Sequence, residues 1–147
     1  MNINDLSMID KEIISFIAEN KVATVCCVEA DHPYCFNCYY SFIEESGLLI
    51  YKSSFGTKHE AILEKNKMVA GTIIPEQIEL TTLRGIQFEG IQLAESLELS
   101  MKASASYYLK FPFAMAMPGK IYVIEMQSVK LTDNSRGFGF KQSWIKQ

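Results

Sequence analysis

The segment with the strongest chemical signal is Thr57-Lys58-His59, where a polar turn leads into a short helix. The turn is Ser53-Ser54-Phe55-Gly56, and an apolar strand, 48–51, precedes it. A helix start leaves backbone N–H groups without partners and carries partial positive charge. A hydroxyl, an ammonium and an imidazole added at that point make a site suited to a phosphate monoester. The ordinary alternative is a threonine N-cap followed by two solvated basic residues.

The four cysteines fall on two expected strands, 22–29 and 34–42, as Cys26, Cys27, Cys35 and Cys38. The spacing Cys35-x-x-Cys38 is typical of zinc ligands. If Glu29 pairs with Tyr34 across the turn 30–33, however, Cys26 and Cys35 share one face of the hairpin, while Cys27 and Cys38 share the other. Four ligands divided between two faces cannot enclose one tetrahedral ion. The sequence therefore predicts small buried thiols and no metal site.

Length and composition limit the classes of protein that the chain could be. At 147 residues it is expected to form one domain, residues 1–147, with 48% apolar and 21% charged residues. The net charge of −3 argues against a nucleic-acid surface, which needs clustered lysine and arginine. No apolar run is long enough to cross a bilayer, and no secretion signal opens the chain. We expect a cytoplasmic protein with reduced thiols.

Hydrophobic periodicity predicts a mainly β protein with a few helices. An amphipathic helix is expected over 5–20, with Ser7-Met8-Ile9-Asp10 resembling a capping box, and further helices over 58–65 and 96–109. The expected strands are 22–29, 34–42, 48–52, 68–74, 79–94 and 121–131. Six strands with so few helices predict a small antiparallel barrel whose openings are capped by helices.

Several of these segments together resemble the FMN-binding split β-barrel superfamily, which includes pyridoxamine 5′-phosphate oxidase. The resemblance rests on Tyr51-Lys52-Ser53, Thr57-Lys58-His59, Val69-Ala70-Gly71-Thr72 and the run from Leu83 to Gly90. It is closest to a small group of uncharacterised bacterial members, through Tyr34 to Tyr40, Lys110-Phe111-Pro112 and Thr132 to Phe140. The resemblance covers nearly the whole chain and implies a six-stranded antiparallel split β-barrel of Greek-key type.

The resemblance also implies a cofactor site between the two subunits of a homodimer. The FMN phosphate is expected at Thr57, Lys58 and His59. The isoalloxazine ring is expected along the second and third strands, beside Asn37, Cys38, Tyr39, Tyr51, Lys52 and Ser53. Residues expected to come from the partner subunit are Arg84, Gln87 and Trp144. Taken without the resemblance, Lys52 reads as an outward strand lysine, Trp144 as a core residue, and Tyr39 and Tyr51 as cross-strand packing.

Departures from the oxidase pattern shape the functional hypothesis. Phe36 stands where the oxidase has an arginine, Gly85 replaces a glutamine, and the C-terminal Arg-x-x-Arg/His elements are missing, so pyridoxamine phosphate oxidation is not expected. The sequence favours an FMN-dependent oxidoreductase that passes electrons between NAD(P)H, or another reductant, and an unknown small molecule. The alternatives are a non-catalytic flavin-binding or sensing module, and a barrel of the same kind that binds haem or a deazaflavin.

Overall fold

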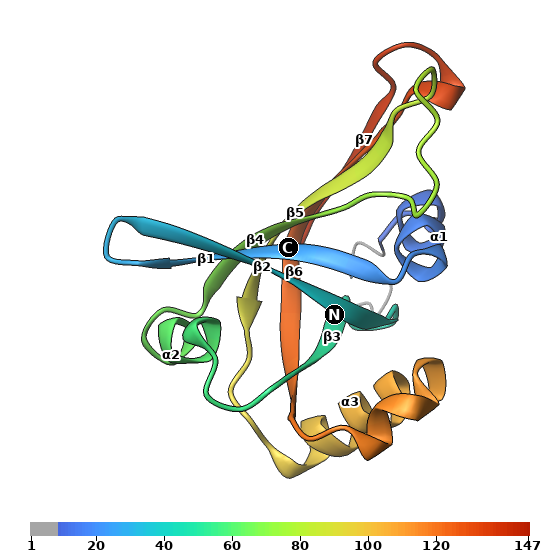
Figure 1. Ribbon diagram of the computed structural model, residues 1–147. Helices are drawn as coiled ribbons and strands as arrows, with labels where there is room; N and C mark the ends of the chain where they lie inside the picture. Colours follow the sequence, from blue (N-terminus) through green and yellow to red (C-terminus); the bar gives the residue numbers. More distant parts are fainter. Residues whose placement is uncertain (1–8) are drawn as a thin grey trace, which may run out of the picture.

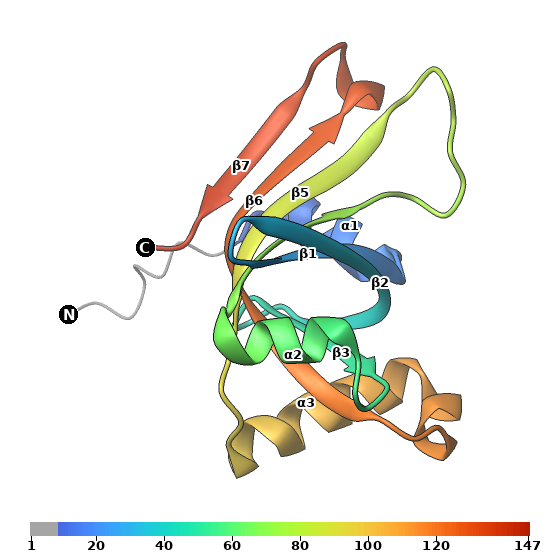
Figure 2. The same cartoon turned by 60° about the vertical axis from the view of Figure 1, so that its left-hand side comes forward.

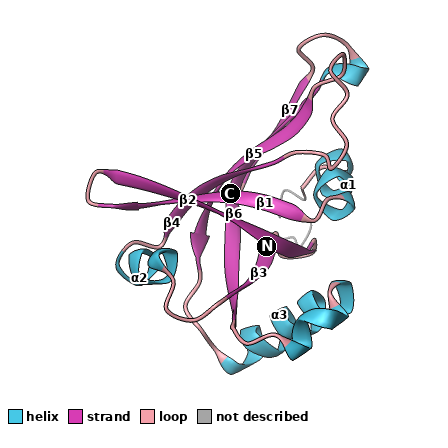
Figure 3. Ribbon diagram, in the orientation of Figure 1, coloured by secondary structure: helices cyan, strands magenta, loops and turns pink. Residues whose placement is uncertain are grey.

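The structure is a computed structural model that describes residues 9–147, and Figures 1 and 3 show its elements. The helices are α1 (Lys11–Glu19), α2 (Lys58–Lys65) and α3 (Leu97–Lys110), with the short 3₁₀ helices η2 (Pro112–Ala116) and η3 (Asn134–Arg136). The strands are β1 (Val22–Glu29), β2 (His32–Ile43), β3 (Leu48–Ser53), β4 (Met68–Ile73), β5 (Arg84–Gln92), β6 (Lys120–Asp133) and β7 (Lys141–Ile145).

All seven strands form one antiparallel sheet in the order β3-β2-β1-β4-β5-β6-β7. Because β3 also pairs with β6, the first six strands of that order close into a ring, and β7 lies outside it along β6 (Figure 2). Strand β4 returns to lie beside β1 after the meander β1-β2-β3, which is the Greek-key order. The predicted six-stranded barrel is thus confirmed for the ring. The predicted strand total was one too low, because the polar β7 gives no apolar alternation.

Two apolar clusters show how the helices are used. Inside the barrel, Tyr40, Tyr51 and Met126 pack with Phe16 of α1 and Leu63 of α2. A second cluster lies on the outer side of β2, β3 and β6, where α3 covers the sheet. Strand β3 is therefore buried on both faces, which explains its unbroken apolar run, 48–51. The expectation that the helices cap the openings is wrong for α3, which packs against the outside of the wall.

Several element boundaries differ from the prediction. Helix α1 begins after Asp10, whose side chain accepts a hydrogen bond from the Glu12 backbone N–H at 2.9 Å; Ser7 of the expected capping box lies outside the described residues. The β1–β2 turn is shorter than expected, because Glu29 pairs with His32 and not with Tyr34. Segment 79–83, expected to extend the fifth strand, belongs to the connection that precedes β5. Among residues 9–147, no helix is both long and apolar enough for a membrane crossing.

Candidate functional site

Four of the predicted site residues lie at the beginning of α2: Ser53, Thr57, Lys58 and His59. We call them the α2 cluster. Thr57 is the N-cap, and its hydroxyl accepts a hydrogen bond from the Glu60 N–H at 3.2 Å. Ser53 ends β3, and its Oγ lies 2.7 Å from the Nε2 atom of His59. Lys58 lies between these groups in sequence and is exposed. The polar turn after β3 thus leads into a helix start that carries hydroxyl groups, an imidazole and a lysine, and the role of these residues in phosphate binding stays a prediction.

His59 is held from two directions. Its ring stacks on Phe36 of β2, with 3.7 Å between ring centroids and 9° between the planes. Burial lowers the pKa of His59 below its ordinary 6.5, although the neighbouring Glu60 opposes this shift. The imidazole is therefore mainly neutral at pH 7 and can exchange a hydrogen bond with Ser53 without adding a charge.

Lys58 supplies the positive charge of this cluster. Its Nζ lies 4.7 Å from the centroid of the Tyr34 ring, on β2. Within residues 9–147, no ion pair involves Lys58. The nearest acid along α2, Glu60, accepts a hydrogen bond from the hydroxyl of Tyr122 at 2.6 Å. The ammonium therefore reaches solvent with a ring beneath it and without a carboxylate that neutralises it.

The predicted contacts of the flavin ring are divided between the two faces of the sheet. Asn37 and Tyr39 are exposed on the outer face of β2, and the Asn37 side chain accepts a hydrogen bond from Thr24 Oγ1 at 2.8 Å. Cys38 and Tyr51 point into the barrel, where Tyr51 donates to Gln92 Oε1 at 2.6 Å. Burial raises the pKa of the Cys38 thiol to about 12. The side chains of Cys38 and Tyr51 thus belong to the core.

Lys52 forms hydrogen bonds with the C-terminal end of α3 and with η2 and the residue that follows it. Its Nζ donates to the hydroxyl of Tyr108 at 2.9 Å, to the carbonyl of Ala114 at 2.8 Å and to that of Met117 at 2.6 Å. An ammonium group has three N–H bonds, so these contacts use all of its donors. The observed role of Lys52 is to fasten segment 112–117 to β3.

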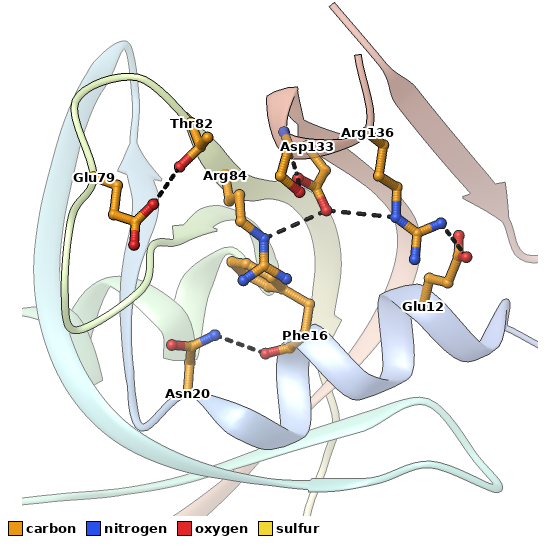
Figure 4. Close-up of polar contacts among 9 residues, drawn as sticks. Glu12, Phe16, Asn20, Glu79, Thr82, Arg84, Asp133 and Arg136 are labelled. Carbon is orange, nitrogen blue, oxygen red and sulfur yellow. Dashed lines mark hydrogen bonds and ion pairs between the residues drawn. The ribbon is translucent and has the colours of Figure 1, made fainter. Parts of the chain in front are cut away.

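Arg84 lies at a different part of the barrel, next to α1. Its Nε is 3.4 Å from a carboxylate oxygen of Asp133, and its guanidinium lies over the ring of Phe16 (Figure 4). Asp133 also pairs with Arg136, which in turn pairs with Glu12 of α1. Figure 1 shows α1 and α2 on different sides of the barrel. The structure therefore does not bring Arg84 to the α2 cluster of the same chain.

Gln87 lines a hollow of about 560 Å³ on the outer surface of the sheet; Trp144 borders this hollow, but its side chain packs against the inner core cluster. We call it the outer hollow; its other lining residues include Thr24, Cys26, Cys35, Thr72 and Lys130. A neighbouring hollow of about 820 Å³, here the α3 hollow, is lined by Asn37, Tyr39, Thr24, Thr72, Lys110, Phe111 and Phe113, among others. Since Thr24 and Thr72 border both, the two hollows are adjacent along β1 and β4.

The cysteines are divided as the sequence predicted, although the register differs. Cys26 lies directly opposite Cys35, and this pair faces outward, while Cys27 and Cys38 are buried on the inner face. The prediction of buried thiols is wrong for Cys35, which is exposed, and holds only in part for Cys26. In the part of the chain that the structure describes, no three metal-ligating side chains gather.

Sequence reasoning missed two aromatic residues that contact the α2 cluster, Phe36 and Tyr34. Phe36 drew notice only because it replaces an arginine of the oxidase pattern. A usable signal was present: the two residues are two apart on one strand, so they share a face. Which helix that face meets depends on the β1–α2–β2 packing, and no local pattern reports it.

Two bacterial proteins are similar to this chain over almost its whole length. A UPF0306 protein of Photorhabdus laumondii is 31% identical over 129 residues, which cover 88% of this chain and 90% of the relative. A UPF0306 protein of Serratia proteamaculans is 30% identical over 136 residues, which cover 92% of this chain and 94% of that protein. No family model matches the chain.

Solved structures share the fold at low sequence identity. A heme-binding protein from Mycobacterium smegmatis superposes with a TM-score of 0.75 and 17% identity; the match covers 92% of this chain but only 57% of that longer one. An FAD-binding protein from Mesorhizobium loti gives 0.63 and 14%, over 85% and 95% of the two chains. A candidate pyridoxamine 5′-phosphate oxidase from Listeria innocua gives 0.61 and 11%, over 82% and 94%. The split-barrel fold inferred from the sequence is thereby confirmed.

Proposed function

This chain belongs to the UPF0306 family, and on that premise we propose that it binds FMN and acts as a homodimeric oxidoreductase. The observation that carries the proposal is the α2 cluster, in which Ser53 contacts His59 and Thr57 caps the helix that Lys58 begins. A phosphate monoester at this helix start would receive hydrogen bonds from backbone N–H and hydroxyl groups and a charge from Lys58.

The chain's own residues have distinct roles in this proposal. Lys58 neutralises the phosphate, and Thr57 and Ser53 orient it. The stacked ring of Phe36 keeps His59 beside Ser53, so that the imidazole needs no reordering when the phosphate arrives. FMN, when bound, supplies the electron and hydride transfer. Asn37 and Tyr39, exposed on the outer face of β2, opposite to the face of Phe36, would border the ring that extends from the phosphate.

The proposed second subunit completes the site. The outer face of β1 and β4 carries two adjacent hollows, and both are open to solvent in one copy. A partner subunit set against this face would bring its own Gln87 to the cofactor, whereas Trp144 is left out because its side chain packs against the core. Arg84 is left out of the proposal, because its guanidinium is engaged by Asp133 and Phe16. The reductant would be NAD(P)H or a similar donor, and the substrate a small molecule.

Two alternative functions are a flavin-binding sensor and a haem-binding protein. A flavin-binding sensor would use the same α2 cluster without turnover. Haem, which one structural neighbour binds, needs an axial ligand, and the histidines of this chain are His32 and His59. His59 is engaged by Ser53 and Phe36, and His32 lies exposed at the start of β2. The arrangement therefore favours a flavin phosphate over a haem that is ligated by histidine.

The test is a titration of the purified protein with FMN, followed by flavin fluorescence and by the mass of the complex in solution. We expect a dimer that binds FMN, and oxidation of NAD(P)H by the complex in the presence of an artificial acceptor. The double variant K58A/H59A should bind at least tenfold more weakly, since each charge-assisted bond contributes about 1.5–3 kcal/mol. A monomer without affinity for FMN would contradict the proposal. Tight binding without any reduction would favour the sensor, and haem absorption bands would favour haem.

A further inference from the structure

The hairpin β1–β2 places two outward-facing thiols directly opposite each other. Its register pairs Cys26 with Cys35. The N–H of Tyr40 donates to the carbonyl of Lys21 at 2.9 Å, so these two residues form a hydrogen-bonded pair. Hydrogen-bonded and non-hydrogen-bonded pairs alternate along antiparallel strands. Counting five pairs along the same register from Lys21 and Tyr40 makes Cys26 and Cys35 a non-hydrogen-bonded pair.

Non-hydrogen-bonded pairs bring side chains together. Their Cα atoms lie about 4.5 Å apart, which is inside the range of about 4.4–6.8 Å that a disulfide spans. The neighbouring pair of the same class confirms how close such side chains come here, because Thr24 Oγ1 donates to Asn37 Oδ1 at 2.8 Å. Burial and then the neighbouring thiol of Cys35 raise the pKa of Cys26, as expected for two thiols at facing positions; the Cys26 Sγ itself lies 3.8 Å from the carbonyl oxygen of Cys27.

The other two cysteines differ from this pair in their exposure to solvent. Cys27 and Cys38 face the inside of the barrel and are buried, with 0% and 8% of their surfaces exposed. Cys35 is exposed and Cys26 is partly exposed, and both line the outer hollow. A small thiol reagent can therefore reach one pair in the folded protein and not the other.

We propose that Cys26 and Cys35 are a redox-active dithiol that forms a reversible intramolecular disulfide by exchange with a low-molecular-weight disulfide. The thiolate of the exposed Cys35 attacks one sulfur of the oxidant and releases one small thiol. Cys26 then attacks the Cys35 sulfur of the mixed disulfide and releases the second. The protein gives up two electrons and two protons, and one small disulfide becomes two small thiols.

The exchange reaction needs no bound flavin, although Cys26 and Cys35 line the outer hollow, which the partner subunit faces in the proposed dimer. The dithiol lies on the β1–β2 hairpin, whereas the α2 cluster is built around Ser53 and His59. Oxidation would tie the hairpin together at the wall of the outer hollow. A cross-strand disulfide of this exposed kind is readily reduced again, which suits a reversible modification.

The experiment equilibrates the reduced, folded protein with buffers that contain reduced and oxidised glutathione in varied ratios. Exchange is then stopped with acid, and free thiols are alkylated in denaturant before intact-mass analysis. Cleavage after Glu29 separates Cys26 and Cys27 from Cys35 and Cys38, which cleavage at lysine or arginine cannot do, because neither residue occurs between Lys21 and Lys52. Fragmentation of the alkylated peptides then identifies the linked pair.

We expect the folded protein to lose two alkylatable thiols together and the mass of two hydrogen atoms, with Cys26 linked to Cys35. The C26S variant should stop at a glutathione adduct on Cys35, and C35S should react several-fold more slowly. Four free thiols in excess oxidised glutathione, a wild-type protein that stops at the adduct, or a link through Cys27, Cys38 or a second chain would each overturn the proposal. Loss of FMN binding in a protein that still forms the link would refute only the proposed function.

Discussion

The α1 side and the α2 side of the barrel both carry cationic side chains, but these side chains have different interaction partners. Next to α1, Arg84 and Arg136 share the carboxylate of Asp133, and Arg136 also pairs with Glu12 (Figure 4). At the start of α2, Lys58 lies over an aromatic ring and takes part in no ion pair within the described residues 9–147.

The difference separates a structural use of charge from one that fits a ligand. Asp133 is 4% exposed, so its ion pairs and hydrogen bonds offset the cost of burying a carboxylate. Its network joins α1 to the ends of β5 and β6. Lys58 stabilises little in this way, and its charge remains available to an anion from solution. Substitutions in the first region should therefore change stability, and substitutions in the second should change affinity.

The largest effect is expected for Asp133→Ala. Burial alone would raise the pKa of Asp133, but hydrogen bonds from Ser135 and the charge of Arg84 outweigh it and lower the pKa below 3.8. The contribution of this carboxylate is thus complete above pH 3.8 and is lost as the pH falls through its folded value. Urea denaturation at pH 7 should show a loss of about 2–4 kcal/mol in the free energy of unfolding.

Glu45→Ala serves as the control for that change, because Glu45 is exposed in the β2–β3 turn. Its effect should stay within about 0.5 kcal/mol. FMN affinity of the folded Asp133→Ala protein should equal that of the wild type. A stable variant with weakened FMN binding would break the division between the two regions.

Lys58→Ala should give the complementary result. Its FMN affinity should fall about 10- to 150-fold, as expected for one charge-assisted contact to phosphate, with little change in urea midpoint. Lys67→Ala, at an exposed position just after α2, is the matched control and should bind FMN normally. Equal affinities of the two variants in a fluorescence titration would remove the α2 cluster as the phosphate site.

The barrel could be predicted because its signals are local. Alternating apolar residues marked β1 and β6, and the polar turn 44–47 marked the hairpin β2–β3. The turn at residues 30–31 escaped prediction for two reasons. Ala30 adopts a φ of 51°, which is unusual for a residue with a side chain, and Pro33 suggested a turn residue. Pro33 fits inside β2 because it faces Val28 in a non-hydrogen-bonded pair, where its missing N–H is not needed.

The candidate site could be predicted only in part. The segment 57–59 is local, so its spacing identified it. Lys52 shows the limit, because its acceptors include the carbonyls of Ala114 and Met117, more than 60 residues away. Arg84 shows it as well: its pairing with Asp133 depends on the β5–β6 register, which sequence spacing alone does not give. Charge type is readable in a sequence, but the partner that neutralises a charge is set by tertiary packing.

A smaller, pH-dependent effect is expected from His59. Because burial lowers its pKa below 6.5, the unfolded chain binds a proton more readily, and stability should fall as the pH drops below about 6.5. One group limits this slope to about 1.4 kcal/mol per pH unit. His59→Gln should flatten the stability profile between pH 6.5 and 5, measured by urea denaturation. Bound FMN should flatten it in the wild type, because a phosphate favours the protonated imidazole; an unchanged profile would indicate that His59 does not contact it.

The smallest effect is expected for Tyr34→Leu, which removes the ring beneath Lys58. A cation–π contact at an exposed site contributes about 0.5–1 kcal/mol, so stability should change by that amount. FMN affinity should change by no more than about two- to fivefold, because the ammonium of Lys58 is kept and only its resting position is lost. A loss as large as that of Lys58→Ala would show that the ring aims the ammonium at the phosphate. The proposed phosphate site would then extend from α2 to β2, and the availability of Lys58 would depend on Tyr34 as much as on the lack of a carboxylate.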